Sequence, residues 1–237
     1  SMYRAFGVWG NYGLSGDGPA LNLWDTSNVT NMNTTFGGCD NFNMPLGNWD
    51  TSNVTNMYGM FQGCESFNQD IGKWNVSKCT SFADMFYDCY AFDQDVGNWS
   101  ISGSGNGSVS AYYMFNGINS TTGNTFNNGG SPSIGKWNAA AFSSITGMFK
   151  DAHKFNQPIG SWDVSNITVM QNLFEGAKVF NQDIGGWNMS NLTGNDCKQM
   201  FYQASAFNNG GSPSINNWDV SNLTDFTNFF RYSAFNQ

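Results

Sequence analysis

The chain has 237 residues, with 9 Lys and Arg against 17 Asp and Glu, which gives a formal net charge of −8 at pH 7. This acidic balance argues against a nucleic-acid partner, because such a partner needs Lys and Arg contacts to phosphate. Hydrophobic residues make up 40% and aromatic residues 16%, so the chain is not expected to be disordered. No apolar run approaches the roughly 20 residues of a membrane span, and direct membrane insertion is not expected.

The chain repeats itself at a fixed interval. The nine residues WDTSNVTNM occur at 24–32 and again at 49–57, and the tryptophans from Trp24 onward are 25, 25, 25, 38, 25, 25 and 31 residues apart. A fixed period is typical of a repeat protein in which each coil buries its apolar face only against its neighbours. We therefore predict a single solenoid over residues 1–237, with eight coils over 21–237.

The two ends interrupt this template. Residues 1–20 are expected to hold a partial N-terminal coil preceded by an expression-tag remnant at Ser1–Met2. The segment around Pro19 matches 212–218, the end of a longer coil, and the chain stops partway through a template at Gln237. These features predict a fragment of a longer array.

The spacing of apolar residues changes within one coil. Trp74 and Val76 alternate with polar residues, which is typical of a β-strand. Over residues 79–89 the step becomes three or four, which is typical of a helical turn, although Asn, Thr and Gly are poor helix formers. We predict an α/β repeat solenoid similar to leucine-rich-repeat proteins, with about 25 residues per coil. Each coil is expected to contain one short parallel strand and one short helical or 3-10 turn.

The run MFQGCESFNQDIG at 60–72, followed by W-N-V-S at 74–77, carries a family resemblance. This pattern resembles the BspA-like leucine-rich repeats of bacterial surface proteins, particularly the form found in mycoplasma lipoproteins, and it covers nearly the whole chain from Leu21 onward. The resemblance implies a surface or secreted module for adhesion and recognition. Trp, Phe and Met stand where better-known leucine-rich repeats have Leu and Ile, which leaves the curvature open.

Ligand binding is predicted on the strand surface beside the tryptophans, where short polar side chains suit hydrogen bonds to sugars or peptide edges. The candidate residues are Asn48, Asp50, Lys73, Asn75, Asn98, Lys136, Asn138, Asp163, Asn188 and Asp219. The Trp rings themselves are predicted to form a buried ladder, because they belong to the apolar set of every coil.

Cysteines recur at one template position, which prefers a small buried residue. Free thiols are favoured there, although disulfides between coils about 5 Å apart stay open. That position is filled in turn by Cys39, Cys64, Cys89, Ile118, Ala152, Ala177, Ala204 and Ser233.

The sequence offers few residues that could form a catalytic or a metal site. His153 is the only histidine and is expected to be solvated at the surface. The pairs Asp25/Asp50 and Asp70/Asp95 leave Ca²⁺ open. Turn chemistry is favoured, because Pro45 and Pro158 occupy the template position of Asp70 and Asp95 in other coils. We predict no catalysis, no metal and no cofactor. The many Asn-x-Ser/Thr sequences are interpreted as hydrogen-bonding residues of the template rather than as glycosylation sites.

The cassette FNNGGSPSI occurs at 126–134 and 207–215, where other coils have FNQDI. Its Gly-Gly-Ser-Pro composition predicts an outward bulge, so that replacing 128–133 by Gln-Asp would preserve the melting temperature. The insertion at 103–108 is the more promising variable contact.

These features together predict an extracellular or cell-surface recognition or adhesion module. It would bind a protein or glycan partner as a monomer, without nucleic acid. The alternative is a purely structural spacer or stalk that presents another domain.

Overall fold

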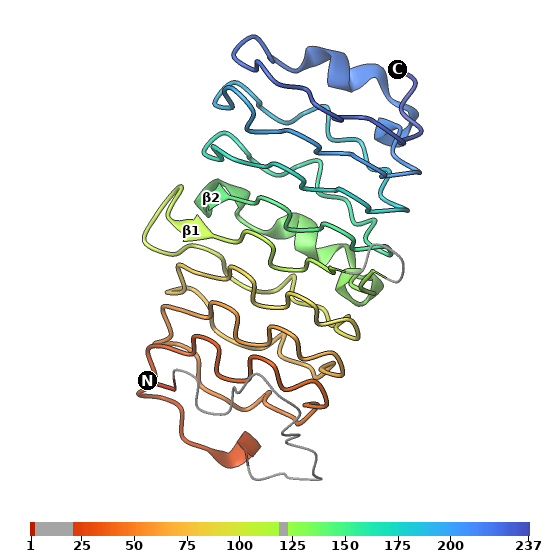
Figure 1. The fold of residues 1–237 in the computed structure, drawn as a ribbon. Coiled ribbons are helices and arrows are strands. Elements are labelled where there is room, and N and C mark those ends of the chain that lie inside the picture. Colours follow the sequence, from red (N-terminus) through yellow and green to blue (C-terminus); the bar gives the residue numbers. More distant parts are fainter. Residues whose placement is uncertain (3–20, 119–122) are drawn as a thin grey trace.

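The computed structural model describes residues 1–2, 21–118 and 123–237. Its coils lie one above another along a single axis, and the two termini lie toward opposite ends of the stack (Figure 1). We number the coils by their tryptophans, from Trp24 in the first to Trp218 in the eighth. The partial coil and Pro19 segment expected within residues 3–20 lie outside the described residues.

Regular secondary structure is sparse, and most described residues form turns and extended segments. The elements are η1 (Leu21–Leu23), β1 (Val109–Ser110), η2 (Asn128–Gly130), η3 (Pro132–Lys136), η4 (Ala139–Ala141), β2 (Phe142–Ser144), η5 (Asn209–Gly211) and η6 (Pro213–Asn217). Strands β1 and β2 pair in parallel across successive coils in the middle of the stack (Figure 1).

One side of each coil carries the contacts that join it to the next. In the second coil the backbone N–H groups of Met57, Gly59, Phe61 and Gly63 donate to carbonyls of the third coil, with N–O distances of 2.8–2.9 Å. The intervening N–H groups of residues 60, 62 and 64 close turns onto the residue three positions earlier. The amides of residues 57 and 59–64 are thus all hydrogen-bonded, which buried backbone requires. We call residues 57–66 and their equivalents in the other coils the ladder face.

This segment is not an α-helix; of the two alternatives expected in each coil, a helical or a 3-10 turn, its i to i−3 hydrogen bonds resemble the second. Two positions of the ladder segment have a positive φ in most coils, for example Gly59 (φ 54°) and Gly63 (φ 70°) in the second. A residue in the left-handed region interrupts a right-handed helix, and Gly, Asn and Asp tolerate it best. The described residues contain no α-helix.

The segment around each tryptophan also differs from the expected strand. Two tight turns flank Trp74, closed by hydrogen bonds from its own N–H to Ile71 O and from Cys79 N–H to Val76 O. The alternation of Trp74 and Val76 therefore reflects two turns that place both side chains inward. Both are buried, at 3% and 0% exposure.

The core is built from stacked aromatic rings. Phe61 packs on Phe67 of the same coil, with ring centroids 4.0 Å apart, and on Phe86 of the next coil at 5.5 Å. The same pair recurs from coil to coil, as in Phe115–Phe126 at 3.7 Å. Such ring pairs add to the large apolar area that each Phe buries.

The predicted tryptophan ladder is confirmed. Trp137 stacks on Trp99 and Trp162 with centroid distances of 6.5 and 6.1 Å, and from the second to the seventh coil every Trp is at most 4% exposed. Each indole N–H donates to a backbone carbonyl of the preceding coil at 2.6–3.3 Å, from Trp49 through Trp218. The ring therefore fills the core and also satisfies a buried acceptor.

An asparagine ladder runs beside the phenylalanines, formed by the Asn or Asp that follows a core Phe in each coil. The side-chain oxygen of one coil's Asn or Asp accepts the backbone N–H of its equivalent in the next, at 2.7–2.9 Å. The accepting residues are Asn43, Asn68, Asp93, Asn127, Asn156, Asn181 and Asn208. The Asn of the Asn-x-Ser/Thr sequences has a similar use, since Asn53 and Asn166 donate to carbonyls of the preceding coil.

The prediction that the cassette bulges outward is wrong for its central residue. Asn128 is fully buried, and its side chain accepts Val96 N–H and donates to Ser131 O and Ser133 Oγ. Asn209 repeats these contacts in the seventh coil. The cassette is an inserted hydrogen-bonding corner, and only its Gly-Gly and Pro tip is exposed.

Candidate recognition surface

The residues predicted beside the tryptophans are all exposed and follow one another along one edge of the stack. Many of them already serve the fold. The side-chain oxygens of Asp50, Asn75, Asp163, Asn188 and Asp219 each accept the backbone N–H two residues later, at 2.9–3.1 Å. These contacts are Asx turns, and they leave less hydrogen-bonding capacity for a ligand. Asn48, Lys73, Asn98, Lys136 and Asn138 project beside them as separate exposed side chains.

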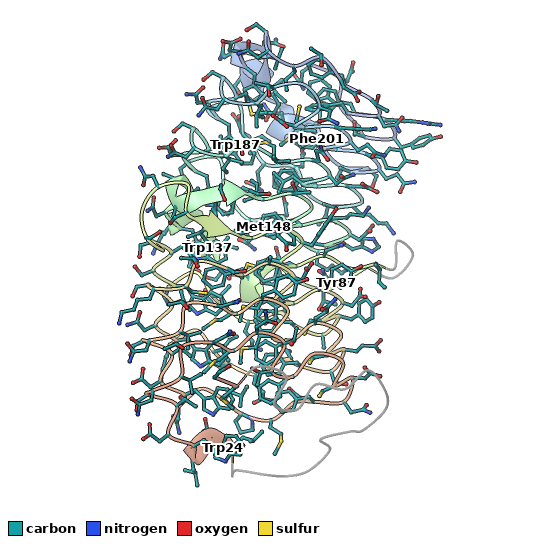
Figure 2. The ribbon with its side chains drawn as sticks, turned by 60° about the vertical axis from the view of Figure 1, so that its left-hand side comes forward. Trp24, Tyr87, Trp137, Met148, Trp187 and Phe201 are labelled. Carbon is teal, nitrogen blue, oxygen red and sulfur yellow. The ribbon has the colours of Figure 1, made fainter. Side chains whose placement is uncertain are left out.

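A second surface, on the ladder face, holds every tyrosine in the described part of the chain. These residues are Tyr58, Tyr87, Tyr90, Tyr112, Tyr113, Tyr202 and Tyr232. Figure 2 shows Tyr87 on the opposite side of the stack from Trp137. All seven rings are partly or largely exposed, whereas most Phe and Trp rings are buried. We call this surface the tyrosine face.

The tyrosine face is densest over the second to fourth coils, where it surrounds a buried carboxylate. Asp84 is 8% exposed, and burial raises its pKa to about 6, partly offset by a hydrogen bond with Tyr58. Burial and the neighbouring Asp84 charge raise the pKa of Tyr58 to about 12. The rings of Tyr58 and Tyr112 lie 6.5 Å apart at 64°.

A second carboxylate lies between the next tyrosines. Asp88 accepts the backbone N–H of Ile118 at 2.7 Å, and burial raises its pKa. Burial, together with the charge of Asp88, raises the pKa of Tyr90 to about 12. The two carboxylates are thus partly desolvated among aromatic rings, an environment in which an added hydrogen-bond donor or cation is favourable.

Charge is distributed unevenly along the ladder face. Its first four coils carry Asp40, Glu65, Asp84 and Asp88 and have no Lys or Arg. Its last four coils carry five basic residues, namely Lys150, Lys154, Lys178, Lys198 and Arg231, against two acidic ones, Asp151 and Glu175. The face therefore has an acidic half and a basic half, although the chain as a whole is acidic.

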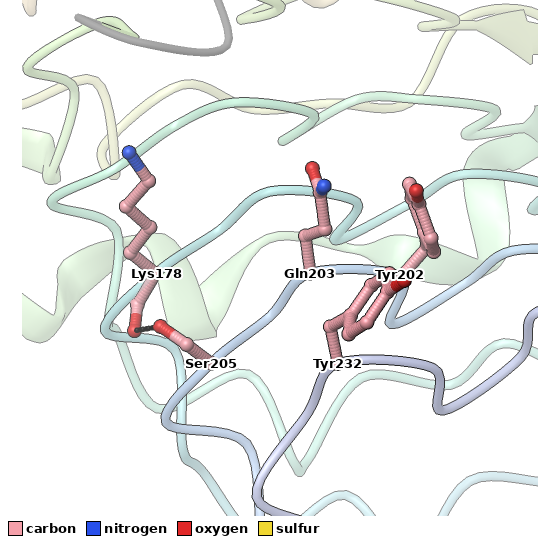
Figure 3. A pocket seen from close by; sticks show the side chains of 5 residues that line it. All are labelled: Lys178, Tyr202, Gln203, Ser205 and Tyr232. Atoms are coloured by element: carbon pink, nitrogen blue, oxygen red, sulfur yellow. Dashed lines mark hydrogen bonds between the residues drawn. The ribbon is translucent and has the colours of Figure 1, made fainter.

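The basic half contains a shallow hollow of about 590 Å³, lined by Lys178, Tyr202, Gln203, Ser205 and Tyr232. Figure 3 shows Gln203 standing between Lys178 and the two tyrosines. The rings of Tyr202 and Tyr232 are 5.8 Å apart at 55°, so they form an angled aromatic wall.

The prediction of a solvated His153 is wrong. His153 is only 9% exposed, with Nε2 3.9 Å from Asp151 Oδ1, and burial raises the pKa of Asp151 to about 6. The longer fourth coil covers the imidazole. Its Gly123 lies so close to the ring that an added Cβ would be only 2.3 Å from His153 Cγ. This tight packing identifies a core histidine rather than an accessible base.

The cysteine position is a buried slot, as predicted, but the assignment of Ile118 to it is wrong. Cys64 and Cys89 are buried free thiols whose Sγ atoms lie 3.1 and 3.0 Å from carbonyls of the preceding coil. Ile118 is 60% exposed. The slot of the fourth coil is filled instead by the buried Asn124, whose side-chain amide donates to Phe115 O. An insertion precedes Asn124, so the repeat pattern alone does not match it to the cysteine position.

The candidate calcium pairs are occupied by turn contacts. Asp25 and Asp50 accept the N–H of Ser27 and Ser52, and hydrogen bonds from these serines lower the pKa of both carboxyls. Asp70 and Asp95 accept the N–H of Gly72 and Gly97. The described residues hold no group of three or more His, Cys, Asp or Glu placed to bind a metal ion.

The tyrosine face could have been found in the sequence at the positions that vary between coils. Every tyrosine from Tyr58 onward occupies a variable position of the M-x-x-M-F-x-x-C-x segment. Once the segment is known to be a ladder with one outward side, these variable positions identify a surface. A helical interpretation distributes them around an axis instead.

Coils that repeat one set of core rings and one ladder of inter-coil hydrogen bonds define a repeat protein. Within that class, the chain belongs to the family described as "Mycoplasma protein of unknown function, DUF285", whose model matches residues 2–128 and 110–237. No curated protein and no solved structure matches it. None of the helices in the described ranges is both long and apolar enough to span a membrane.

Proposed function

We propose that this protein is an extracellular or cell-surface recognition module of the BspA-like leucine-rich-repeat type. It binds a protein or glycan partner, without catalysis, through the tyrosine face. The observation that carries the proposal is the gathering of all seven described tyrosines on one face of a stack whose other aromatic rings are mostly buried.

The fold does not require these tyrosines. The position of Tyr87 is filled by Gln62 in the second coil and by Glu175 in the sixth, and the position of Tyr90 by Glu65 and Lys178. The ladder hydrogen bonds at these positions are made by the backbone in every case. Tyrosine presents a large, rigid and amphipathic surface at low conformational-entropy cost, and it is enriched at recognition interfaces.

The edge beside the tryptophans is a weaker candidate, because its Asp and Asn oxygens already accept Asx-turn hydrogen bonds. The regularity of the stack favours the alternative function, a spacer that presents another domain. A spacer, however, gives no reason for half-exposed tyrosines to cluster around the buried Asp84 and the partly buried Asp88.

Binding of the labelled protein to a printed glycan array and to intact animal cells tests the proposal. The variant Tyr87→Gln with Tyr90→Ser introduces residues that occupy these positions in other coils, so it should fold normally. We expect it to lose binding while its melting temperature is retained. The matched control, Lys136→Asn with Asp163→Asn, changes the tryptophan edge and should bind as the wild type does.

Loss of binding in the control alone would move the site to the tryptophan edge. A wild-type protein that binds neither the array nor the cells would favour the spacer.

A further inference from the structure

The hollow at the basic end of the tyrosine face combines three kinds of group. Two tyrosine rings from successive coils form its wall, and Tyr202 and Tyr232 meet at 55° with centroids 5.8 Å apart. An aromatic face offers an apolar surface on which the C–H side of a pyranose ring can stack. Two rings set at an angle favour a small, non-planar ligand over a flat one.

The polar groups of the hollow suit a polyhydroxylated ligand. Gln203 offers both an amide donor and a carbonyl acceptor, and it is exposed. The Ser205 hydroxyl donates to Lys178 O at 3.2 Å, which leaves its oxygen able to accept from a ligand. A sugar hydroxyl both donates and accepts, so such mixed groups satisfy it better than charges of one sign do.

Lys178 adds a positive charge to this lining. Arg231 strengthens it, because its guanidinium lies 4.7 Å from the centroid of the Tyr232 ring and donates to Tyr232 Oη at 2.8 Å. The nearby Glu175 is engaged by Lys150 at 2.9 Å, which neutralises part of the opposing charge. Burial raises the pKa of Asp151, whose carboxyl lies beneath the face, and the positive charge of Lys178 offsets part of that rise.

The size of the hollow limits the ligand. A volume of about 590 Å³ falls within the range of small-molecule sites, and its open form suits one or two sugar units of a longer chain. Few groups are fully enclosed, so the contacts should give weak binding to a single sugar and useful binding only in a larger glycan.

We propose that this hollow is a subsite for a pyranose that carries a carboxylate, with the ring against Tyr202 and Tyr232 and the carboxylate toward Lys178. This inference rests on the proposed function and names a ligand class for one part of the tyrosine face. Both uronic acids and nonulosonic acids present this chemistry, and the experiment separates them.

Chemical-shift mapping of the isotope-labelled protein with three methyl glycosides tests the proposal. Methyl glucuronide and the methyl glycoside of N-acetylneuraminic acid are the two acidic probes, and methyl glucoside is the neutral one. We expect shifts at Tyr202, Gln203 and Tyr232 with at least one acidic probe, and an affinity about tenfold weaker for methyl glucoside. The tighter acidic probe identifies the source of the carboxylate.

Three variants use residues that other coils carry at the same positions. Lys178→Ser should remove the preference for acidic over neutral sugar, and Tyr202→Gln should abolish binding of all three probes. Lys136→Asn, on the tryptophan edge and outside the tyrosine face, should leave all affinities unchanged.

Shifts outside the hollow, equal affinity for the neutral sugar, or an acidic preference that survives Lys178→Ser would overturn the proposal. Cell binding that survives Tyr202→Gln but is lost in the Tyr87→Gln, Tyr90→Ser variant would overturn the sugar subsite alone. That result would leave the proposed function standing.

Discussion

At the scale of single residues, asparagine and aspartate serve three structural purposes in this chain. Their side chains link successive coils, as Asn68 does for Asp93, and they close the turn after most of the tryptophans, as Asp163 does. They also occupy left-handed backbone positions, as Asn172 does at φ 58°. These uses explain why polarity comes from short side chains, with charged residues at only 11% of the sequence.

Asp84 occupies a left-handed position at φ 54° and is buried, with a pKa raised to about 6 from 3.8. Its ionised form is therefore less favourable in the folded state, and the free energy of unfolding should fall as pH rises from about 4 to about 6. Asp84→Asn keeps an acceptor for Tyr58 and tolerates positive φ. We expect the variant to be more stable than the wild type near neutral pH, and urea unfolding should show the difference shrinking toward about pH 4.

Asp163 supplies a control of opposite sign. Hydrogen bonds from Ser165 lower its pKa, so its contribution is present above the unfolded value of 3.8 and is lost below it. Asp163→Asn should lower the free energy of unfolding slightly, by an amount that stays constant between about pH 4 and 7 and shrinks as the pH falls below 3.8. A pH-independent difference between wild type and Asp84→Asn would contradict the desolvation argument.

Thr34 is a β-branched residue at φ 47°, where such side chains are strained. Its buried hydroxyl has no hydrogen-bond partner within the described ranges. Thr34→Gly should therefore raise the free energy of unfolding by about 1 kcal/mol, because strain and an unsatisfied group disappear together. Thr30→Gly, at an exposed site without positive φ, should lower it by up to about 1 kcal/mol. Equal signs for the two variants would contradict this account.

At the scale of the element, the sequence identified which residues form the core but not the backbone conformation of the segments that hold them. Trp74 and Phe86 were recognisable as core residues from their period, and both are buried. The three-residue step over 79–89 was ambiguous, because successive turns closed by i to i−3 hydrogen bonds produce it as well as a helix does. Only the inter-coil bonds, which depend on residues about 24 positions away, distinguish the two.

The candidate site was missed for the same reason. Placing a strand at Trp74 made its flanking residues look like the outward surface, whereas the outward side of the ladder lies at Tyr58, Tyr87 and their equivalents. The buried position of Asn128 was missed because the cassette at 126–134 has the composition of a surface loop. A buried network made by Asn cannot be told from a solvated turn by residue type.

The cassette corner is the element that most clearly depends on one side chain. Asn128→Ala removes the acceptor of Val96 N–H and the donor to Ser133, and it places Ala at φ 55°. We expect a loss of about 2–4 kcal/mol in the free energy of unfolding, and the same loss for Asn209→Ala. Replacing 128–133 by Gln-Asp should also lower the melting temperature.

Pro132→Ala at the exposed tip of the same corner is the matched control, with an expected change within about 1 kcal/mol. If Asn128→Ala were as mild as this control, the corner would be a surface loop after all.

At the scale of the whole molecule, most contacts of the stack join neighbouring coils, with Tyr58–Tyr112 as an exception, so its stability should be distributed along one axis. Each ladder bond joins adjacent coils, and ring stacks such as Phe115–Phe149 and Phe149–Phe174 cross one boundary at a time. In such an array a defect in the middle separates two blocks that retain their own interfaces. Solution scattering should show an elongated particle, as the arrangement in Figure 1 implies.

Phe149→Ala places such a defect in the fifth coil, where the ring is fully buried and packs on Phe155 at 3.8 Å. A truncation of this kind costs about 3–5 kcal/mol, and the shorter C-terminal block should then unfold first. Buried thiols report on the two blocks separately, with Cys64 and Cys89 on one side of the defect and Cys197 on the other. Pulsed thiol labelling in increasing urea, read by peptide mass spectrometry, should show Cys197 reacting at a lower concentration than Cys64. Phe61→Ala, in the second coil, should reverse that order. If both variants shift all three thiols together, the stack unfolds as one cooperative unit and the nearest-neighbour description is wrong.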